Sequence, residues 1–168
     1  MRLFIVRHAI AVPHGTPGVA EDDRYLTDAG IEKMKEAAAG LLEIGAVPEL
    51  VLSSPLVRAR QTADILLYVF GKKIRLTLTP HLAPGGSREE LYQQIRKHQE
   101  LGSLMLVGHQ PSLGEIAGEI AWGSCEHYVE LKKGGTCAID LEQLNPVPRG
   151  VLRYLLTPAI LRRIGGRD

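Results

Sequence analysis

The sequence predicts an α/β fold in which helices cover both faces of a mostly parallel sheet, a three-layer α/β/α arrangement. Short apolar runs typical of buried strands alternate along the chain with longer amphipathic stretches typical of helices. The first run, residues 3–6, is apolar at four consecutive positions, which indicates a strand buried on both faces. Arg7 and His8 follow it directly. Because ligands of open α/β sheets bind beyond the carboxyl ends of the strands, both are candidate site residues.

Length and composition indicate an ordinary globular protein, and we expect residues 1–168 to form a single domain. The formal net charge of +1 argues against a nucleic-acid or membrane-surface partner, and the sequence has no apolar run approaching a transmembrane helix. Since Arg7 interrupts the apolar opening, we expect this segment to stay in the mature protein. Cys125 and Cys137 lack a metal-ligand spacing and are predicted to be free buried thiols in a reducing cytoplasm.

The first half of the chain predicts one further strand between two helices. Residues 9–23 contain two prolines and two glycines and predict a long loop, of the kind that is often functional. Thr27 is the expected N-cap of a helix whose apolar positions recur at three and four as far as Leu42. Residues 50–54 predict a second buried strand, which ends at Pro55.

The next predicted helix, residues 56–66, begins with two cations, Arg58 and Arg60. The free N–H groups and the dipole at a helix N-terminus already favour an anion there. Two cations at this end are unfavourable for the helix alone, but an anion bound between them would compensate. This placement is modest support for an anionic ligand.

The second half of the chain repeats the opening pattern. Residues 74–79 predict a third strand, and Ser87 with Glu90 three positions later predicts a capping box at the start of a helix. Residues 103–108 are a further apolar run, and His109 follows that run as His8 follows the first. The sequence therefore places a second histidine at the edge of the sheet that carries Arg7 and His8.

The C-terminal part predicts one more helix and a hairpin. Ser112 is the expected N-cap of a helix that ends at Trp122. Residues 136–141 and 151–156 are predicted to form a hairpin at one edge of the sheet. The basic tail is predicted to be frayed and solvated; it contains Arg162, Arg163 and Arg167.

Four polar side chains are thus expected to meet at one edge of the sheet: Arg7, His8, Arg58 and His109. Arginine forks bind phosphate oxygens bidentately and stay charged at any working pH. A neutral imidazole can attack phosphorus if its other nitrogen is held by an acceptor, and a protonated second histidine would stabilise the transferring oxygens. Such a site requires no metal and no cofactor.

Three motifs in order resemble the histidine phosphatase superfamily, whose members have the phosphoglycerate mutase-like fold. They are Arg7-His8 after the first strand, the run SSPLVRARQTA at residues 53–63, and Val107-Gly108-His109. The small size and two further segments resemble the SixA-type phosphohistidine phosphatases; these segments are Arg24-Tyr25-Leu26-Thr27 and Leu156-Thr157-Pro158. The resemblance implies that His8 is the nucleophile and that the phosphate pocket consists of Arg7, Arg58 and His109, with Arg24 as a further candidate cation.

One expected feature is missing from the motif pattern. Superfamily members that cleave phosphate esters carry an acidic residue in mid-chain as proton donor, and here the region offers only Glu89 and Glu90. Both are explained as first-turn residues of a helix. Because an imidazole leaves more readily without a proton than an alkoxide does, we expect a metal-independent phosphatase acting on phosphohistidine in a protein.

Two other functions stay open at this point. One is a phosphomonoesterase that acts on a small phosphometabolite and uses Glu89 or Glu90 as its acid. The other is a non-catalytic module that binds a phosphoprotein, although binding alone needs no nucleophile and His8 and His109 are both present.

Overall fold

The described strands form one sheet whose centre is the first strand of the chain. The structure is a computed structural model that describes residues 1–71, 73–124 and 126–166. Within these ranges the sheet has six strands in the order β3-β2-β4-β1-β5-β6. Their bounds are Arg2–Arg7 (β1), Leu50–Ser53 (β2), Arg75–Leu78 (β3), Ser103–Gly108 (β4), Thr136–Gln143 (β5) and Arg149–Leu156 (β6).

The sheet is parallel over four strands and antiparallel at one edge. β1 pairs with β4, β4 with β2 and β2 with β3 in parallel, whereas β5 and β6 are antiparallel additions. The register places Arg7 opposite Gly108 and Ser53 opposite Val107, so β1, β2 and β4 end at the same edge. This confirms the predicted mostly parallel sheet and the hairpin at its edge.

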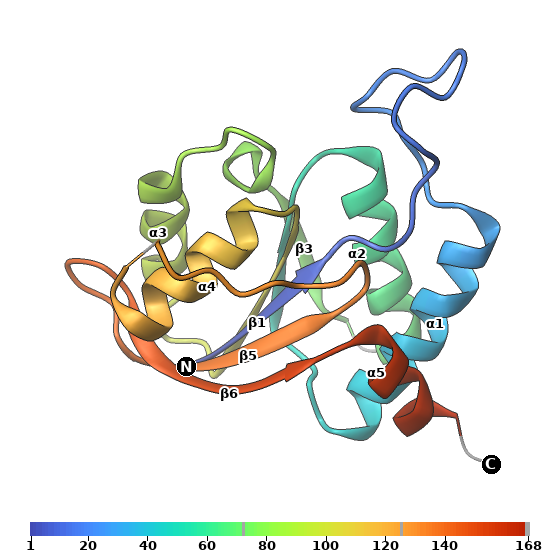
Figure 1. The fold of residues 1–168 in the computed structure, drawn as a ribbon. Helices are drawn as coiled ribbons and strands as arrows, with labels where there is room; N and C mark the ends of the chain where they lie inside the picture. Colours follow the sequence, from blue (N-terminus) through green and yellow to red (C-terminus); the bar gives the residue numbers. More distant parts are fainter. Residues whose placement is uncertain (72, 125, 167–168) are drawn as a thin grey trace.

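Helices cover both faces of the sheet, as predicted. In Figure 1, α1, α2 and α5 lie on one side of the strands and α3 and α4 on the other. The bounds are Asp28–Glu43 (α1), Val57–Phe70 (α2), Arg88–Arg96 (α3), Ser112–Trp122 (α4) and Pro158–Gly165 (α5). A short 3-10 turn, η1, spans Pro80–Leu82.

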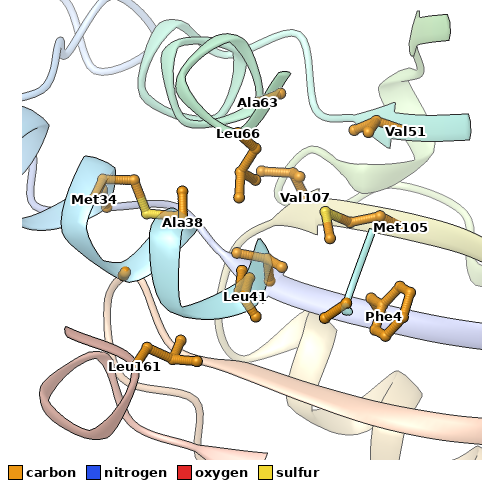
Figure 2. Packing of buried hydrophobic residues seen from close by; sticks show 14 of the residues in the cluster. Phe4, Met34, Ala38, Leu41, Val51, Ala63, Leu66, Met105, Val107 and Leu161 are labelled. Carbon is orange, nitrogen blue, oxygen red and sulfur yellow. The ribbon is translucent and has the colours of Figure 1, made fainter. Parts of the chain in front are cut away.

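The two hydrophobic cores explain why the first strand is apolar at four consecutive positions, residues 3–6. Successive side chains of a strand point to opposite faces. Phe4 and Val6 pack with residues of α1, α2 and α5 (Figure 2), whereas Leu3 and Ile5 pack with residues of α3 and α4. The backbone at the end of β1 is therefore held from both sides.

Two predicted helix caps are confirmed and one is wrong. Thr27 Oγ1 accepts the Gly30 N–H at 3.0 Å, and Ser87 Oγ accepts the Glu90 N–H at 3.3 Å. Ser112, however, is already the first helical residue of α4, and Pro111 in the cap position has no side-chain acceptor. Gln110 supplies the missing acceptor because its Oε1 binds the Gly114 N–H at 2.7 Å.

The prediction of a frayed C-terminus is wrong for the residues that form α5. Thr157 caps this helix, and Leu161 is fully buried against the core on the α1 side. Arg162 Nη1 lies 3.8 Å from Glu36 of α1, so even a basic tail residue faces this helix. Arg167 lies outside the described residues.

The predicted thiol state is confirmed at one of its two positions. Cys137 is a free, buried thiol in β5, and burial raises its pKa to about 12. Cys125 lies outside the described residues. In the part of the chain that the structure describes, no helix has the length and apolarity that crossing a membrane would require.

Candidate active site

Backbone hydrogen bonds bring the ends of β1, β2 and β4 together at the carboxyl edge of the sheet. The His8 N–H donates to the Gly108 carbonyl at 2.9 Å, and the Ser54 N–H donates to the Val107 carbonyl at 2.9 Å. The residues that follow the three strands, His8, Ser54 and His109, are consequently neighbours. The strand-end positions inferred from the sequence do converge.

The His8 imidazole is buried, and its backbone neighbour determines its tautomer. His8 is only 6% exposed, and its Nδ1 atom lies 2.7 Å from the Ala9 carbonyl oxygen. Because a carbonyl oxygen can only accept, Nδ1 must carry the proton, which leaves the Nε2 lone pair available in the neutral ring. Burial is the main reason that the pKa of His8 is lowered to about 3. His8 is therefore a neutral base at physiological pH.

Thr62 in α2 helps to hold the carbonyl group that orients His8. The Ala9 N–H donates to Thr62 Oγ1 at 3.0 Å, and this hydroxyl donates in turn to the Arg58 carbonyl at 2.7 Å. The tautomer of His8 is thus fixed by a chain of bonds that begins in the first turns of α2.

His109 lies close to His8 and is also neutral in this structure. The two ring centroids are 5.1 Å apart, and His109 Nε2 shares a hydrogen bond of 2.8 Å with Ser54 Oγ. Burial, followed by the nearby charge of Arg58, lowers the pKa of His109 to about 4. The expectation of a protonated His109 therefore does not hold for the free site. A phosphate dianion beside the ring would raise this pKa.

Arg7 and Arg58 provide the positive charge of the site, and backbone carbonyls hold both side chains. Arg7 Nη1 donates to the Leu131 carbonyl at 2.8 Å, and Arg58 Nη1 donates to the Glu21 carbonyl at 2.8 Å. Burial lowers the pKa of both guanidinium groups, which nevertheless stay charged. Four buried side-chain polar atoms of the described residues have no hydrogen-bond partner, and two of them, Arg7 Nε and His109 Nδ1, belong to this site. Buried polar atoms normally have partners, so this pair is suited to receive a ligand's oxygens.

The structure places Arg24 next to Arg58 through a shared carboxylate. Arg24 Nη1 donates to Glu21 Oε1 at 2.7 Å, and the same oxygen lies 3.5 Å from Arg58 Nη2. The Arg24 side chain is only 14% exposed, and its Nε donates to the Val12 carbonyl. The candidate cation suggested by the family resemblance therefore borders the other charged groups.

Glu21 is the residue at this site that the sequence analysis missed. It lies in the long loop between β1 and α1, which projects away from the rest of the molecule in Figure 1. Its second carboxylate oxygen, Oε2, lies 2.6 Å from Nδ1 of His14, an exposed residue of the same loop. The available signal in the sequence was the acidic run of residues 21–23 directly before Arg24.

Three other charged candidates lie elsewhere in the structure. Arg60 is exposed and lies 4.0 Å from Asp64 of its own helix, so it does not join Arg58 in binding an anion. Glu89 and Glu90 are exposed in the first turn of α3. The cavity that Glu89 lines also contains Tyr92 and Glu119, but none of the four expected site residues. A proton-donor role for either glutamate stays a prediction.

The donor set of the site suits an oxyanion better than a metal ion. Across the described ranges, no group of three or more His, Cys, Asp and Glu side chains is placed to share a metal. Instead, the positive charges of Arg7 and Arg58 act on two neutral imidazoles at the carboxyl ends of parallel strands. Such a fold and site have the features of a phosphoryl-transfer enzyme with a histidine nucleophile.

Comparison with known proteins gives the family. The model of the histidine phosphatase superfamily (branch 1) matches residues 3–101, which is more than half of the chain. The chain therefore belongs to the histidine phosphatase superfamily, and it is a phosphatase by class. An uncharacterized protein of a Picosynechococcus strain is 40% identical over 144 residues, covering 80% of this chain and 82% of the relative.

Solved structures agree with this assignment. The protein histidine phosphatase SixA complexed with tungstate has a TM-score of 0.83 at 21% identity, covering 95% of this chain and 98% of that one. The proposed phosphohistidine phosphatase SixA from Agrobacterium tumefaciens has a TM-score of 0.74 at 27% identity, covering 94% and 97%. Phosphatases of small molecules share the fold as well.

Proposed function

We propose that this protein removes phosphate from phosphohistidine in a phosphorylated protein, through a phosphohistidine intermediate on His8. The observation that carries the proposal is the 2.7 Å hydrogen bond between His8 Nδ1 and the Ala9 carbonyl. It leaves Nε2 as the free, unprotonated nitrogen of a buried ring. The partly buried Arg7 and the buried Arg58 provide the charge that a phosphoryl group needs.

The proposed reaction has two steps. In the first, the Nε2 lone pair of His8 bonds to phosphorus while the P–N bond of the substrate breaks, and its electron pair stays on the leaving imidazole. Arg7 and Arg58 stabilise the equatorial oxygens during this in-line transfer. In the second step, water attacks the phosphorus of phospho-His8, and the products are inorganic phosphate and neutral His8.

The carboxylates favour a P–N substrate over an alkyl phosphate. An alkoxide leaving group needs a proton donor, which is typically worth about 10²–10⁴-fold in rate. Glu21 contacts Arg24 and Arg58, and hydrogen bonds from His14 and Arg24 hold its pKa at about 2. A carboxylate held in its ionised form is a poor acid, whereas an imidazole leaves as a stable neutral molecule. The SixA structures are compatible with this substrate class because they share the fold.

The nucleophile is tested by trapping. His8→Ala should abolish turnover, and only wild-type protein should yield an acid-labile, base-stable phosphoenzyme with labelled substrate. His127→Ala, which removes an exposed histidine from the surface, serves as the control and should be trapped like wild type. Chelators should leave the rate unchanged. Turnover by the His8→Ala protein would contradict the proposal.

The substrate class is tested by comparing leaving groups with one enzyme preparation. We expect kcat/KM to be highest for a phosphohistidine peptide, lower for an activated aryl phosphate and lowest for an alkyl phosphate. Glu89→Gln and Glu90→Gln should change the phosphohistidine rate little, since both residues begin a helix. If alkyl phosphates react fastest and one of these variants removes that activity, the enzyme is a phosphomonoesterase with a proton donor on α3.

A further inference from the structure

The two carboxylate oxygens of Glu21 face different partners. Oε1 accepts from Arg24 Nη1 at 2.7 Å and lies 3.5 Å from Arg58 Nη2, so it is anchored to the cations of the phosphate site. Oε2 lies 2.6 Å from the Nδ1 atom of His14. The backbone of Glu21 is fixed as well, because its carbonyl accepts from Arg58 Nη1. One oxygen is therefore held by the site, and the other binds an imidazole.

The imidazole on Oε2 can leave without disturbing the site. The His14 side chain is 84% exposed and comes from the same loop, whereas Glu21 itself is 45% exposed. Glu21 also acts on His109 electrostatically, since its charge is among those that affect the pKa of this ring. The carboxylate thus lies at the border between the buried histidines and solvent, where a substrate's leaving group would be.

We infer that Glu21 is the acceptor for the imidazole of the phosphohistidine substrate, and that it determines the preference for a histidine leaving group. This inference rests on the proposed function. In the complex, Oε2 would bind the N–H of the substrate ring at the nitrogen that does not carry phosphorus, in place of His14. Glu21 would touch the substrate without donating a proton.

The transfer between two imidazoles is balanced in charge and protons. The reactive substrate carries a proton on the ring nitrogen away from phosphorus, and that N–H donates to Glu21. As His8 Nε2 bonds to phosphorus, the P–N electron pair moves onto the leaving ring, which departs neutral with its proton still in place. The positive charge passes to the His8 ring, whose own N–H donates to the Ala9 carbonyl.

Each of the two rings therefore donates a hydrogen bond to an acceptor from the nitrogen that does not bond to phosphorus. For His8 the acceptor is a backbone carbonyl, and for the substrate it is a carboxylate. A negative charge favours the protonated form of the substrate ring, which is the form with a good leaving group. An aryl phosphate has no such N–H and gains nothing from this carboxylate.

Glu21→Gln tests the inference because it removes the charge and keeps the size of the side chain. The two substrates are a phosphohistidine peptide and p-nitrophenyl phosphate. We expect kcat/KM for the peptide to fall at least about tenfold, as hydrogen bonds to charged groups are the stronger ones. Because Glu21 also contacts Arg24 and Arg58, kcat/KM for p-nitrophenyl phosphate should fall as well, but much less, so that the ratio of the two values changes in favour of p-nitrophenyl phosphate. Asp23→Asn removes a neighbouring exposed carboxylate from the same loop and should change neither rate.

Two more variants sharpen the result. Glu21→Asp keeps the charge and should retain more of the peptide activity than Glu21→Gln. His14→Ala removes the competing imidazole and should lower KM for the peptide with kcat unchanged. Equal losses on both substrates with Glu21→Gln, or no loss on either, would overturn the role of Glu21 while leaving the proposed function in place. Failure of wild-type protein to hydrolyse the peptide would overturn the proposed function and this inference with it.

Discussion

Arg58 combines burial with a fixed orientation, which makes its guanidinium shape important as well as its charge. The residue is 5% exposed, and its Nη1 is held by the Glu21 carbonyl at 2.8 Å. A lysine ammonium is a point charge that cannot hold this carbonyl and two phosphate oxygens in one plane. Arg58→Lys should therefore lower kcat/KM by about 10²-fold, the usual cost of one lost transition-state donor.

Steady-state kinetics on the phosphohistidine peptide would measure this effect. Arg60→Lys is the matched control, because Arg60 lies two positions further along the same helix and is exposed. It should have wild-type activity. Near-wild-type activity of Arg58→Lys would show that the guanidinium fork is not used.

The two buried histidines should make folding stability depend on pH in the weakly acidic range. Their pKa values are about 3 for His8 and about 4 for His109, against an ordinary value of 6.5. Between those pKa values the unfolded chain binds more protons than the folded protein does, so the free energy of unfolding falls as the pH drops below about 6.5. Each histidine contributes a slope of up to about 1.4 kcal/mol per pH unit. About one unit above pH 6.5 and higher, both rings are neutral in the folded and the unfolded protein, and the slope from the histidines disappears.

Urea unfolding between pH 5 and 7 isolates this effect. Glu21 and Asp140 have pKa values of about 2 in the fold, so their contribution is lost mainly at lower pH. His109→Gln should remove the contribution of one histidine, up to about 1.4 kcal/mol per pH unit, from the slope of stability against pH. This expectation does not depend on how the substitution changes stability at pH 7. An unchanged slope in this variant would mean that His109 is not held neutral by the fold.

At this scale the sequence predicted which residues lie together at the edge of the sheet, but not how their side chains are held. Arg7, His8 and His109 could be found because each follows an apolar strand. The tautomer of His8 could not, since it depends on one carbonyl oxygen at 2.7 Å. Glu21 was missed because its partners Arg24 and Arg58 come from a loop and a helix whose packing is tertiary.

At the scale of elements, a glycine determines how closely α5 approaches α1. A Cβ atom on Gly40 would lie 2.0 Å from the Leu161 carbonyl oxygen, which is backbone and cannot turn away. Replacing a helical glycine by alanine ordinarily stabilises a helix by about 0.5–1 kcal/mol. Here we expect Gly40→Ala to destabilise the protein by about 1–3 kcal/mol, the cost of overpacking a core.

The midpoint of urea denaturation, at unchanged m-value, would measure this change. Lys35→Ala on the exposed side of α1 is the control and should stay within about 0.5 kcal/mol of wild type. A gain in stability from Gly40→Ala would show that α5 does not dock on α1 in solution.

The same contact explains why α5 could not be predicted. Three arginines dominate the tail of the sequence, and only Leu161 is fully buried. Its burial depends on Gly40, more than a hundred residues away in the chain. The cap of α4 was missed for a related reason: the side chain of Gln110 reaches over Pro111 to supply the acceptor, and no N-cap pattern describes that arrangement.

At the scale of the whole molecule, the site joins segments that are distant in sequence. His8 follows β1, Arg58 belongs to α2 and His109 follows β4, and β1 lies next to β4 in the centre of the sheet. The alternation of strands and helices was enough to predict that these residues share one edge. The loop that carries Glu21 was predicted from its prolines, its glycines and its length, but its packing against Arg58 was not.

A ligand that bridges these segments should stabilise the fold by linkage. An oxyanion bound only by the folded protein stabilises it by about 2.7 kcal/mol at a hundredfold excess over Kd. For a chain of this size, that corresponds to a rise in Tm of about 5–10 °C. Inorganic phosphate or tungstate should produce this shift in wild-type protein and in Arg60→Lys, whereas Arg58→Lys should show a smaller one. The control is the same thermal unfolding measurement with chloride at matched ionic strength, which gives the general effect of salt on Tm. Equal shifts in wild type and Arg58→Lys would show that the anion binds elsewhere, for example on the arginines of α5. Phosphate would then not bind at the site that contains the two buried histidines.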